Sequence, residues 1–472
     1  MGVFLMIIAI MMALGLVFSY VYNEPDKQAL ILSAAITFVS GLVLFLINRN
    51  VDYQAINKRD GFIIVSSTWV VISLFGTLPF LLSGAIDNFT DAFFETMSGF
   101  TTTGATILTD IEAVSKGVLY WRSLTQWIGG MGVIVLALAI MPILGIGGMQ
   151  LFIAEVPGPT KDKLHPRITQ TAKLLWGIYV LLTFTQALLL YAGGMNVFES
   201  VCHAFTTMAT GGFSTRNASI AAFSPYIQYV TAIFMFLAGT SFVLHYYALR
   251  FRFRKVWESE EFRMYFKIIA ITTAFITISL IFTTEASFGT AFRDALFQTI
   301  SITTTTGFIT ADYLLWHHYL WLLIFILMFT GGCAGSTGGG IKIVRQLLLF
   351  KNSRLELRRL IHPKAIVPVR LSGKAIPEGI IYNVLAFFII YILIFVFSSL
   401  FMSLIGLDFE TSIGSVAASI GNIGPGLGKV GPVDNYSFIP IPGKWLLAFL
   451  MLLGRLELFT VLVLFTATFW KK

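Results

Sequence analysis

The sequence has few charged residues and almost no cysteine. Only 12% of its 472 residues are Asp, Glu, Lys or Arg, whereas 56% are hydrophobic, and the mean hydropathy is +0.82. A composition so poor in charge excludes an ordinary soluble domain. The two cysteines, Cys202 and Cys333, lie in different apolar stretches. They cannot form a disulfide framework or a metal cluster, and we interpret both as packing residues.

Long apolar stretches account for most of the chain. Ten of them approach or exceed the ~20 residues that a helix needs to cross the hydrocarbon core of a bilayer. Nine contain no charged residue, and the exception is the last, which holds Arg455 and Glu457. The sequence therefore predicts an all-α integral membrane protein. The stretches are 1–22, 28–47, 61–86, 123–150, 174–196, 226–249, 268–284, 313–341, 380–407 and 445–470.

Four short glycine-centred segments recur at intervals of about a hundred residues, each between two long apolar stretches. They are Thr102-Thr103-Gly104, Thr210-Gly211-Gly212, Thr305-Thr306-Gly307 and Asn422-Ile423-Gly424. An acid stands 13 residues before the last glycine in three of them (Asp91, Glu199 and Asp294), and in the fourth Thr411 has that place with Glu410 beside it. A small backbone-rich loop that is used four times around one axis can replace the hydration shell of a cation.

Each glycine segment follows a stretch that is too short to cross a bilayer, namely 91–101, 197–209, 290–303 and 408–420. Irregular backbone at membrane depth is tolerated only inside protein or beside a wet cavity, so four such loops predict a central pathway with pseudo-fourfold symmetry. We therefore expect an N-terminal helix pair at 1–60 and four pore units of span, half-helix, loop and span. The units cover 61–164, 165–261, 262–375 and 376–472.

Basic residues concentrate in alternate connections between the apolar stretches. Of the 32 Lys and Arg residues, 24 lie in the segments 48–60, 150–173, 250–267, 342–374 and 471–472. By the positive-inside rule these segments face the cytoplasm, both termini are inside, and the glycine segments enter from outside. Nucleic-acid binding is not expected, because the basic charge follows the topology instead of forming one face.

The predicted half-helices favour a cation as the permeant species. Each starts outside near an acid and ends at a glycine segment, so its C-terminal end presents partial negative charge to the axis. Glycine lets the loop point carbonyl groups inward, and the threonine hydroxyls can add oxygen ligands or fix the loop. Glycine and threonine also allow close helix packing in lipid. Four segments in register favour the cation pathway over that alternative.

These segments resemble the superfamily of K+ transporters, and within it the bacterial Trk-type potassium uptake subunits (TrkH/TrkG). The resemblance covers essentially the whole chain, and the extra helices at 1–60 favour the Trk type over the Ktr type. The residues that carry it are 101–106, 209–215, 304–308 and 421–425, together with Gly129-Gly130-Met131-Gly132 and Glu155-Val156-Pro157-Gly158-Pro159.

The resemblance implies a dimeric, multi-pass protein of the bacterial cytoplasmic membrane that takes up K+ through one channel-like pore per chain. The twelve residues of the glycine segments would form the selectivity filter, the only expected K+ site. Each loop is shorter than that of tetrameric K+ channels, and Asn422-Ile423 replaces Thr-Thr in the fourth. We therefore expect passage of K+ and Rb+ over Na+, with weaker discrimination than a K+ channel shows.

A second glycine cluster interrupts the stretch 313–341. Residues 330–340 read Thr-Gly-Gly-Cys-Ala-Gly-Ser-Thr-Gly-Gly-Gly, and so many glycines break a helix because each costs about 1 kcal/mol. The family places an intramembrane loop here beneath the filter, which predicts a mobile gate; a passive helix kink is the alternative. The gate residues would be Gly331, Gly332, Gly335, Ser336, Thr337, Gly338, Gly339 and Gly340.

Arg455 is a charge within a predicted span, where it is expensive unless it faces a cavity or a partner. A bond to Glu457 is disfavoured, because residues two apart do not share a helix face. The resemblance places such an arginine near the ion path, so we expect it to oppose cation passage and to act with the glycine loop as a gate. Pairing with another carboxylate is the alternative.

The connection 342–374 carries nine basic residues and one acid, Glu356. It can serve as a topological anchor or a contact for anionic membrane lipid. The resemblance implies instead the docking of a cytoplasmic TrkA-like regulatory ring with RCK domains. The chain has no nucleotide-binding motif, so control by ATP, ADP or NAD(H) would come through that partner, and no cofactor is expected in the chain itself.

Two other classes are disfavoured by the sequence. A carrier with a midplane site is often built from inverted repeats, whereas these repeats all run the same way. An intramembrane enzyme needs a nucleophile and base or a metal set, and neither pattern is present. The sequence leaves open whether K+ moves passively or as an H+- or Na+-coupled symporter.

Overall fold

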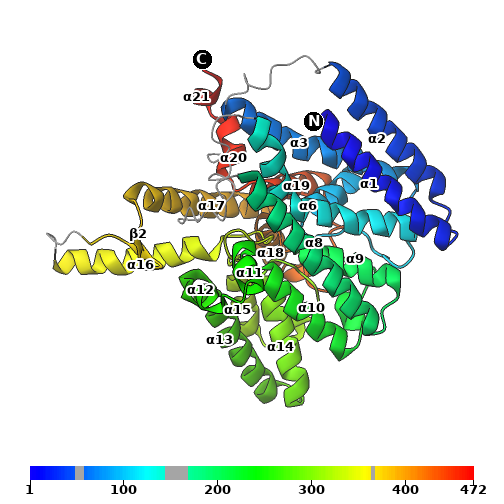
Figure 1. The fold of residues 1–472 in the computed structure, drawn as a ribbon. Coiled ribbons are helices and arrows are strands. Elements are labelled where there is room, and N and C mark those ends of the chain that lie inside the picture. The colour runs from blue at the N-terminus through cyan, green and yellow to red at the C-terminus, as the bar shows by residue number, and fades with distance from the viewer. Residues whose placement is uncertain (48–57, 144–167, 363–366, 472) are drawn as a thin grey trace.

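The computed structural model describes all residues except 48–57, 144–167, 363–366 and 472, and it also omits the side chains of 58, 131–143 and 168–172. Within the described part, six helices are long and apolar enough to cross a membrane, and two bent helix pairs raise that number to eight. The helices surround a centre where several chain segments leave regular structure (Figure 1).

An N-terminal hairpin of α1 (Gly2–Val21) and α2 (Lys27–Ile47) packs along one side of the molecule (Figure 1). Gly2 and Gly41 lie where the two backbones come too close for any side chain, which is how small residues bring membrane helices together. Asp26 in the turn accepts hydrogen bonds from the Ser115 hydroxyl (2.7 Å) and the Val118 N–H (3.1 Å). These bonds fix the hairpin to the start of α6 (Lys116–Ile143).

The rest of the chain repeats one pattern: a long helix, a short helix, a loop and a second helix. The first repeat has α3 (Lys58–Gly76), α4 (Leu78–Leu82), α5 (Phe89–Phe100) and α6, and the second has α8 (Ile168–Ala192), α9 (Val197–Met208), α10 (Pro225–Ala238) and α11 (Phe242–Leu249). After α12 (Phe253–Glu258) the third has α13 (Glu260–Thr283), α14 (Phe288–Thr303), α15 (His318–Met328) and α16 (Ile343–Ile361). A small hairpin, β1 (Arg370–Leu371) and β2 (Lys374–Ala375), leads to the fourth: α17 (Glu378–Leu404), α18 (Phe409–Gly421), α19 (Ile441–Arg455), α20 (Phe459–Leu462) and α21 (Ala467–Trp470).

The short helices α5, α9, α14 and α18 start from one kind of signal. The side chain of the preceding residue accepts a hydrogen bond from an N–H of the first turn, with Asn88, Asn196, Ser287 and Asp408 in this role. Such caps stabilise a helix by about 1 kcal/mol each. Their bounds lie within two residues of those expected from the sequence. One expectation was wrong: Asp294 lies in the second turn of α14 and not at its start, because α14 begins at Phe288.

Two predicted spans, 226–249 and 445–470, are broken rather than continuous. The chain bends by 106° between α10 and α11 and by 111° between α19 and α20. At the first break the free backbone groups find partners in the glycine-rich segment 330–340, since the Gly239 carbonyl accepts from the Cys333 N–H (2.8 Å) and the Phe242 N–H donates to the Gly335 carbonyl (3.0 Å). These tertiary hydrogen bonds stabilise a helix end that the local sequence does not specify.

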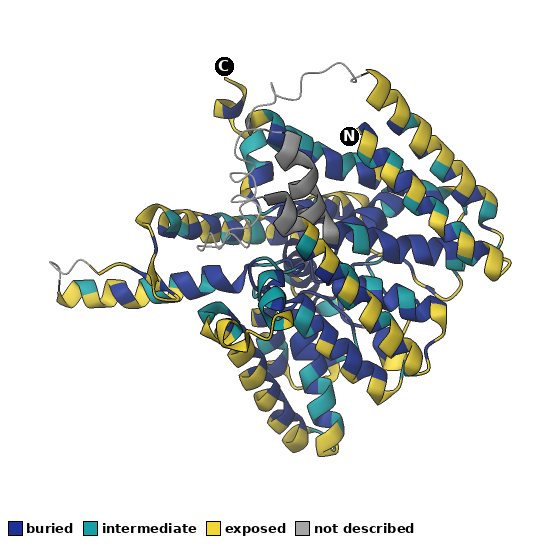
Figure 2. Cartoon of the chain, viewed as in Figure 1, coloured by how far each residue is buried: buried dark blue, intermediate teal, exposed yellow. Residues whose placement is uncertain are grey.

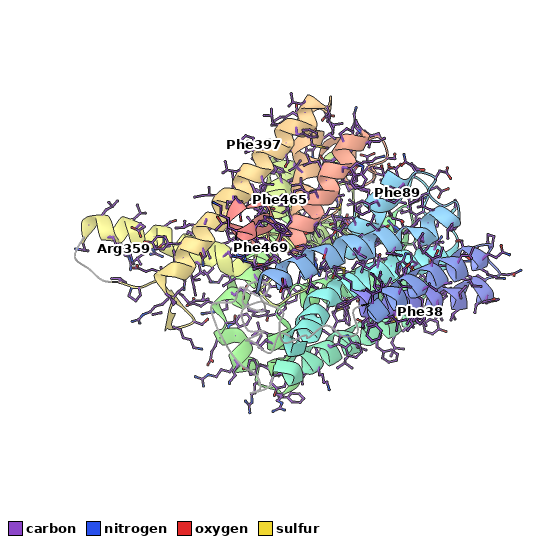
Figure 3. The ribbon with its side chains drawn as sticks, turned by 90° about the horizontal axis from the view of Figure 1, so that it is seen from above. Phe38, Phe89, Arg359, Phe397, Phe465 and Phe469 are labelled. Carbon is purple, nitrogen blue, oxygen red and sulfur yellow. The ribbon has the colours of Figure 1, made fainter. Side chains whose placement is uncertain are left out.

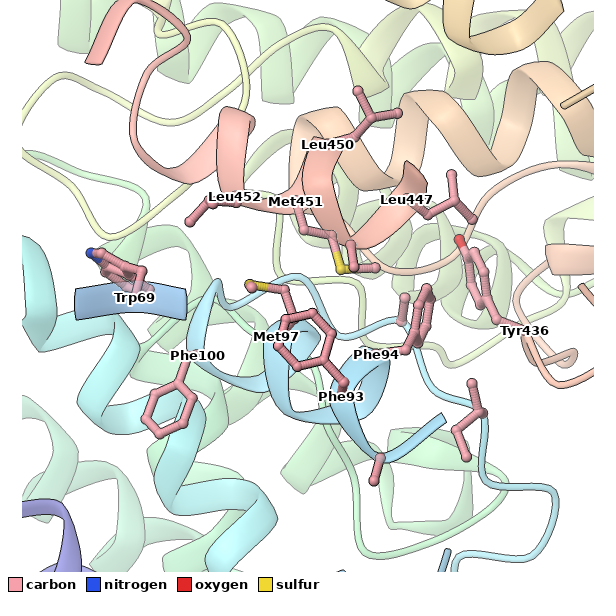
Figure 4. Packing of buried hydrophobic residues seen from close by; sticks show 14 of the residues in the cluster. Trp69, Phe93, Phe94, Met97, Phe100, Tyr436, Leu447, Leu450, Met451 and Leu452 are labelled. Atoms are coloured by element: carbon pink, nitrogen blue, oxygen red, sulfur yellow. The ribbon is translucent and has the colours of Figure 1, made fainter. Parts of the chain in front are cut away.

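Burial increases toward the centre of the molecule (Figure 2). Phe93 and Met97 of α5 face Leu447 and Met451 of α19 in a tightly packed cluster (Figure 4). The outer helices instead carry exposed apolar side chains such as Phe397, which points away from the body (Figure 3). Apolar side chains on the outside and polar loops at the centre are the arrangement expected for a chain that is surrounded by lipid.

Candidate functional site: four loops around one axis

The four glycine segments share one unusual backbone. In each, the first residue has a positive φ, the second does not, and the third is a glycine with a positive φ. A left-handed conformation costs a non-glycine residue about 1–2 kcal/mol, so its presence in three threonines and one asparagine needs support from the surrounding structure. The φ values are 55° and 82° for Thr102 and Gly104, 53° and 76° for Thr210 and Gly212, 59° and 79° for Thr305 and Gly307, and 54° and 96° for Asn422 and Gly424.

The loops contact one another in a closed cycle. A Cβ on Gly104 would overlap the carbonyl oxygen of Gly211 in the second loop, and a Cβ on Gly212 would overlap that of Thr306 in the third. The pattern continues from Gly307 to Ile423 and returns from Gly424 to Thr103 in the first loop. Equivalent backbone atoms therefore meet in the order one, two, three, four, one, which is a pseudo-fourfold ring made by a single chain.

The ring is rich in oxygen and helix C-termini. The carbonyl groups of Thr103, Gly211, Thr306 and Ile423 lie at equivalent places, each beside a glycine of the neighbouring loop. The short helices end directly before the loops, so their C-terminal partial negative charges also gather here. On the side that the chain reaches after the glycines, a pocket of about 110 Å³ is lined by all four last glycines and by Asp434 and Tyr436. The arrangement can hold a bare monovalent cation without a charged ligand.

A buried ion pair behind the ring connects the first loop to the second. Glu95 of α5 is fully buried and accepts hydrogen bonds from the Ile107 N–H (2.9 Å) and from Nε of Arg122 on α6 (2.7 Å). Arg122 donates in turn to the Ser214 carbonyl (2.9 Å), and its guanidinium lies 3.6 Å from the centre of the Phe213 ring. The pair thus fixes the backbone that follows the glycine in both loops.

Side chains from three of the repeats also hold the second and fourth loops. Gln126 of α6 donates to the Gly211 carbonyl (2.6 Å) and accepts from the Phe213 N–H (3.1 Å). Tyr313 donates to the Gly426 carbonyl (2.6 Å), and Tyr436 donates to the Gly424 carbonyl (2.6 Å). None of these supporting residues was expected from the sequence, because a single polar residue in an apolar stretch gives no sign of a partner far away in the chain.

The second glycine cluster forms a non-helical loop between α15 and α16, on the side of the ring where the short helices end. We refer to residues 330–341 as the glycine loop. The Thr337 hydroxyl donates to the Met208 carbonyl at the end of α9 (3.0 Å), and the Gly339 N–H donates to the Thr305 hydroxyl (2.7 Å). The loop therefore contacts the end of α9 and the third segment on the face opposite the pocket.

The remaining residues of the glycine loop fold it on itself. The Gly331 N–H donates to the Ile341 carbonyl across the neck of the loop (2.9 Å), and the Gly332 carbonyl accepts from the Ile343 N–H (3.3 Å). Gly335 and Gly340 have positive φ values of 75° and 64°. The Ser336 N–H donates to the Cys333 carbonyl (3.1 Å). A Cβ on Gly338 would lie 3.0 Å from the Thr304 carbonyl oxygen.

Arg455 lies at the end of α19, at the break in the last helix, and contacts both the ring and the glycine loop. Its guanidinium donates to the Thr102 hydroxyl (3.0 Å), the Thr337 carbonyl (2.7 Å) and the Gly129 carbonyl (2.8 Å). Glu457 instead pairs with Arg345 on α16 (2.5 Å). The expected gate arginine and gate loop are thus brought together, and they meet the first segment at Thr102.

Other expectations concern parts of the chain away from the ring. Glu155-Val156-Pro157-Gly158-Pro159 and the predicted boundary at 164 lie outside the described residues, and the predicted boundary at 60 falls inside α3, which begins at Lys58. The connection 342–374 contains α16, which extends away from the body, and the β1–β2 hairpin (Figure 1). The ring residues named from the sequence all lie at the centre, whereas the basic connection lies at the edge.

Comparison with known proteins agrees with this architecture. Residues 26–472 match the TrkH family, described as cation transport proteins. The chain is 42% identical to the Trk system potassium uptake protein TrkH of Halomonas elongata, covering 100% of this chain and 98% of that protein. It is 43% identical to the protein of the same name from Escherichia coli K12, over 97% and 95%.

A crystal structure of the potassium transporter TrkH from Vibrio parahaemolyticus has the same fold. The TM-score is 0.90 at 37% sequence identity, over 100% of this chain and 98% of that one. The match confirms the predicted all-α membrane fold, and the family consists of transporters rather than enzymes. The chain therefore belongs to the TrkH family of cation transport proteins.

Proposed function

We propose that the chain takes up potassium through a channel-like pore whose selectivity filter is the ring of four loops. The observation that carries the proposal is the closed cycle in which each last glycine meets a carbonyl oxygen of the next loop. The names of the relatives, which are potassium uptake proteins, agree with it. The filter would consist of Thr102, Thr103, Gly104, Thr210, Gly211, Gly212, Thr305, Thr306, Gly307, Asn422, Ile423 and Gly424.

Selectivity in this proposal comes from backbone carbonyls at nearly equivalent places. A ring of carbonyl oxygens replaces the hydration shell of a large monovalent cation better than that of a small one. The four loops are short and differ in sequence, so we expect K+ and Rb+ to pass over Na+ with modest discrimination. Asn422 is bonded to Thr103 (2.9 Å), which makes the fourth position chemically distinct from the others.

The gate in this proposal is the glycine loop together with Arg455. The loop lies across the inner face of the filter and bonds to Thr305, while Arg455 bonds to Thr102 and to the loop at Thr337. A fixed positive charge at this place repels a cation that leaves the filter. The gate residues would be those expected from the sequence: Gly331, Gly332, Gly335, Ser336, Thr337, Gly338, Gly339, Gly340 and Arg455.

We further propose a homodimer in the bacterial cytoplasmic membrane, with both termini in the cytoplasm and a soluble TrkA-like ring as regulator. Support comes from α16, which extends from the body and exposes both basic and apolar side chains. Leu360 and Ile361, for example, are 79% and 74% exposed at its tip. Nucleotide control would reach the chain through this partner, and membrane lipid would contact the basic connection.

Cation flux in proteoliposomes of the purified chain tests the filter. Gly307→Ser places a Cβ against the Ile423 carbonyl at a position where φ is 79°. We therefore expect the parent chain to carry downhill K+ and Rb+ flux faster than Na+ and Li+ flux, and the variant to lose this preference. The matched control is Gly289→Ser, because Gly289 lies on the same repeat with nothing near its Cβ position. Unchanged selectivity in Gly307→Ser would refute the proposed filter.

The same assay separates a channel from a coupled symporter. A channel-like pore supports Rb+ flux down its own gradient, whatever the H+ and Na+ gradients are. Flux that appears only when an H+ or Na+ gradient is imposed would instead establish coupled transport. Flux that appears only when the cytoplasmic partner is added would show that the gate stays closed in the isolated chain.

A further inference from the structure

The glycine loop is held by a carboxylate that belongs to neither the proposed filter residues nor the proposed gate residues. Glu261 lies in the first turn of α13, outside the glycine loop and outside the ring. One of its oxygens, Oε1, accepts hydrogen bonds from the Ala334 N–H (2.6 Å) and from the Val344 N–H (3.2 Å). A single oxygen atom therefore binds the backbone of the loop and the backbone of α16.

The two backbone groups lie on either side of the part of the loop that contacts the filter. Thr337, which bonds to the end of α9, and Gly339, which bonds to Thr305 of the third segment, are both between Ala334 and Val344 in the chain. As long as both bonds to Glu261 are present, the arms of the loop cannot separate. A movement that pulls the loop away from the filter by shifting α16 must break at least one of them.

The first turns of α16 are tied to two other carboxylates, both from neighbouring elements. Glu260, beside Glu261, pairs with Lys351. Glu457, at the break after α19, pairs with Arg345 (2.5 Å). Helix α16 is thus held by three carboxylates. Among the described contacts, Glu261 is the only one of the three that also binds the glycine loop.

We propose that Glu261 is a positioning residue that latches the glycine loop closed and couples its release to movement of α16. This inference rests on the proposed function in taking the loop as the barrier to ions. The latch depends on the reach of the side chain rather than on its charge. A glutamine keeps an oxygen at the same distance from the backbone, whereas an aspartate keeps the charge but is one methylene shorter.

Cys333 provides a native reporter of loop release. It is fully buried in the loop, and Cys202 is the only other cysteine in the sequence. In a Cys202→Ser background, the rate at which a methanethiosulfonate reagent modifies Cys333 in the full-length protein measures how often the loop opens. We expect Glu261→Asp to raise this rate about tenfold, the effect of losing one hydrogen bond of ordinary strength, and Glu261→Gln to leave it near the parent value.

The two substitutions give opposite results if the carboxylate acts only through its charge. Glu261→Gln would then accelerate labelling and Glu261→Asp would not, and that pattern would overturn the latch. Equal labelling in both variants and the parent would also overturn it. Glu258→Asp is the matched control, because Glu258 is exposed on α12 and pairs only with the still more exposed Arg254 among the described contacts.

Rb+ flux through the same variants separates the latch from the proposed gate. We expect Glu261→Asp to raise basal Rb+ flux about tenfold, with an unchanged ratio of Rb+ to Na+, because the filter is not altered. Faster labelling of Cys333 without higher flux would establish the latch and refute the loop as the barrier. Loss of the Rb+ to Na+ ratio would show that Glu261 acts on the filter and would overturn its assignment to the loop.

Discussion

Replacing Arg122 by Met tests whether the buried ion pair behind the ring holds the first two loops in place. Glu95 and Arg122 are only 0% and 2% exposed, so the substitution leaves a buried carboxylate without its cation. Removal of one partner from a buried pair costs about 3–5 kcal/mol, because the remaining charge keeps its desolvation penalty. Glu95→Gln combined with Arg122→Met removes both charges. We therefore expect the double variant to lose about 2 kcal/mol less stability than the sum of the losses in the two single variants.

The free energy of unfolding, measured by detergent titration, and the ratio of Rb+ to Na+ flux together check this prediction. We expect the single variants to lose both stability and ion preference, since the pair fixes Ile107 and Ser214 directly behind the glycines. Arg254→Met is the control, because Arg254 pairs with Glu258 at the surface and such pairs are worth less than about 1 kcal/mol. Strictly additive costs, or normal selectivity in a destabilised single variant, would contradict the reasoning.

Two further predictions concern charges on opposite sides of the ring. Arg455→Gln removes the cation that bonds to Thr102 and Thr337, so we expect basal Rb+ efflux from proteoliposomes to rise about tenfold. Unchanged efflux would refute the proposed part of Arg455 in the gate. In the pocket beyond the last glycines, which the proposed topology places outside, burial and the nearby Asp312 raise the pKa of Asp434, so this carboxyl takes up its proton at a higher pH than an ordinary aspartate. Uptake at low K+ should therefore fall as the outside becomes mildly acidic, and Asp434→Asn should flatten that dependence if Asp434 attracts the ion.

The positions of the loops could be predicted because they depend on local features. A capping residue, a short apolar helix and a threonine or asparagine before x-Gly recur four times, and each feature acts within a few residues. The glycine loop was equally visible, since six glycines between 331 and 340 cannot continue a helix. Assigning these segments to ion conduction still relied on the family resemblance, and their roles in the filter and gate remain predictions.

The broken helices and the supporting polar residues could not be predicted from the sequence. The break after Arg455 passes through Glu457 and Leu458, which are good helix formers but have φ values of 56° and 36° here. The pairing of Glu457 with Arg345, more than a hundred residues earlier, stabilises a carboxylate at this place. Glu95 and Arg122 were similarly invisible as a pair, because nothing local indicates that two elements will bring them together.

The closed cycle of four loops belongs to one polypeptide, and this has a consequence for how its properties can change. In a ring built from four identical subunits, one codon alters all four positions at once. Here one codon alters a single quarter, as Asn422 illustrates beside the threonines of the other three loops. Natural variation and protein engineering can therefore change the proposed filter one quarter at a time, while the other three quarters keep the ring intact.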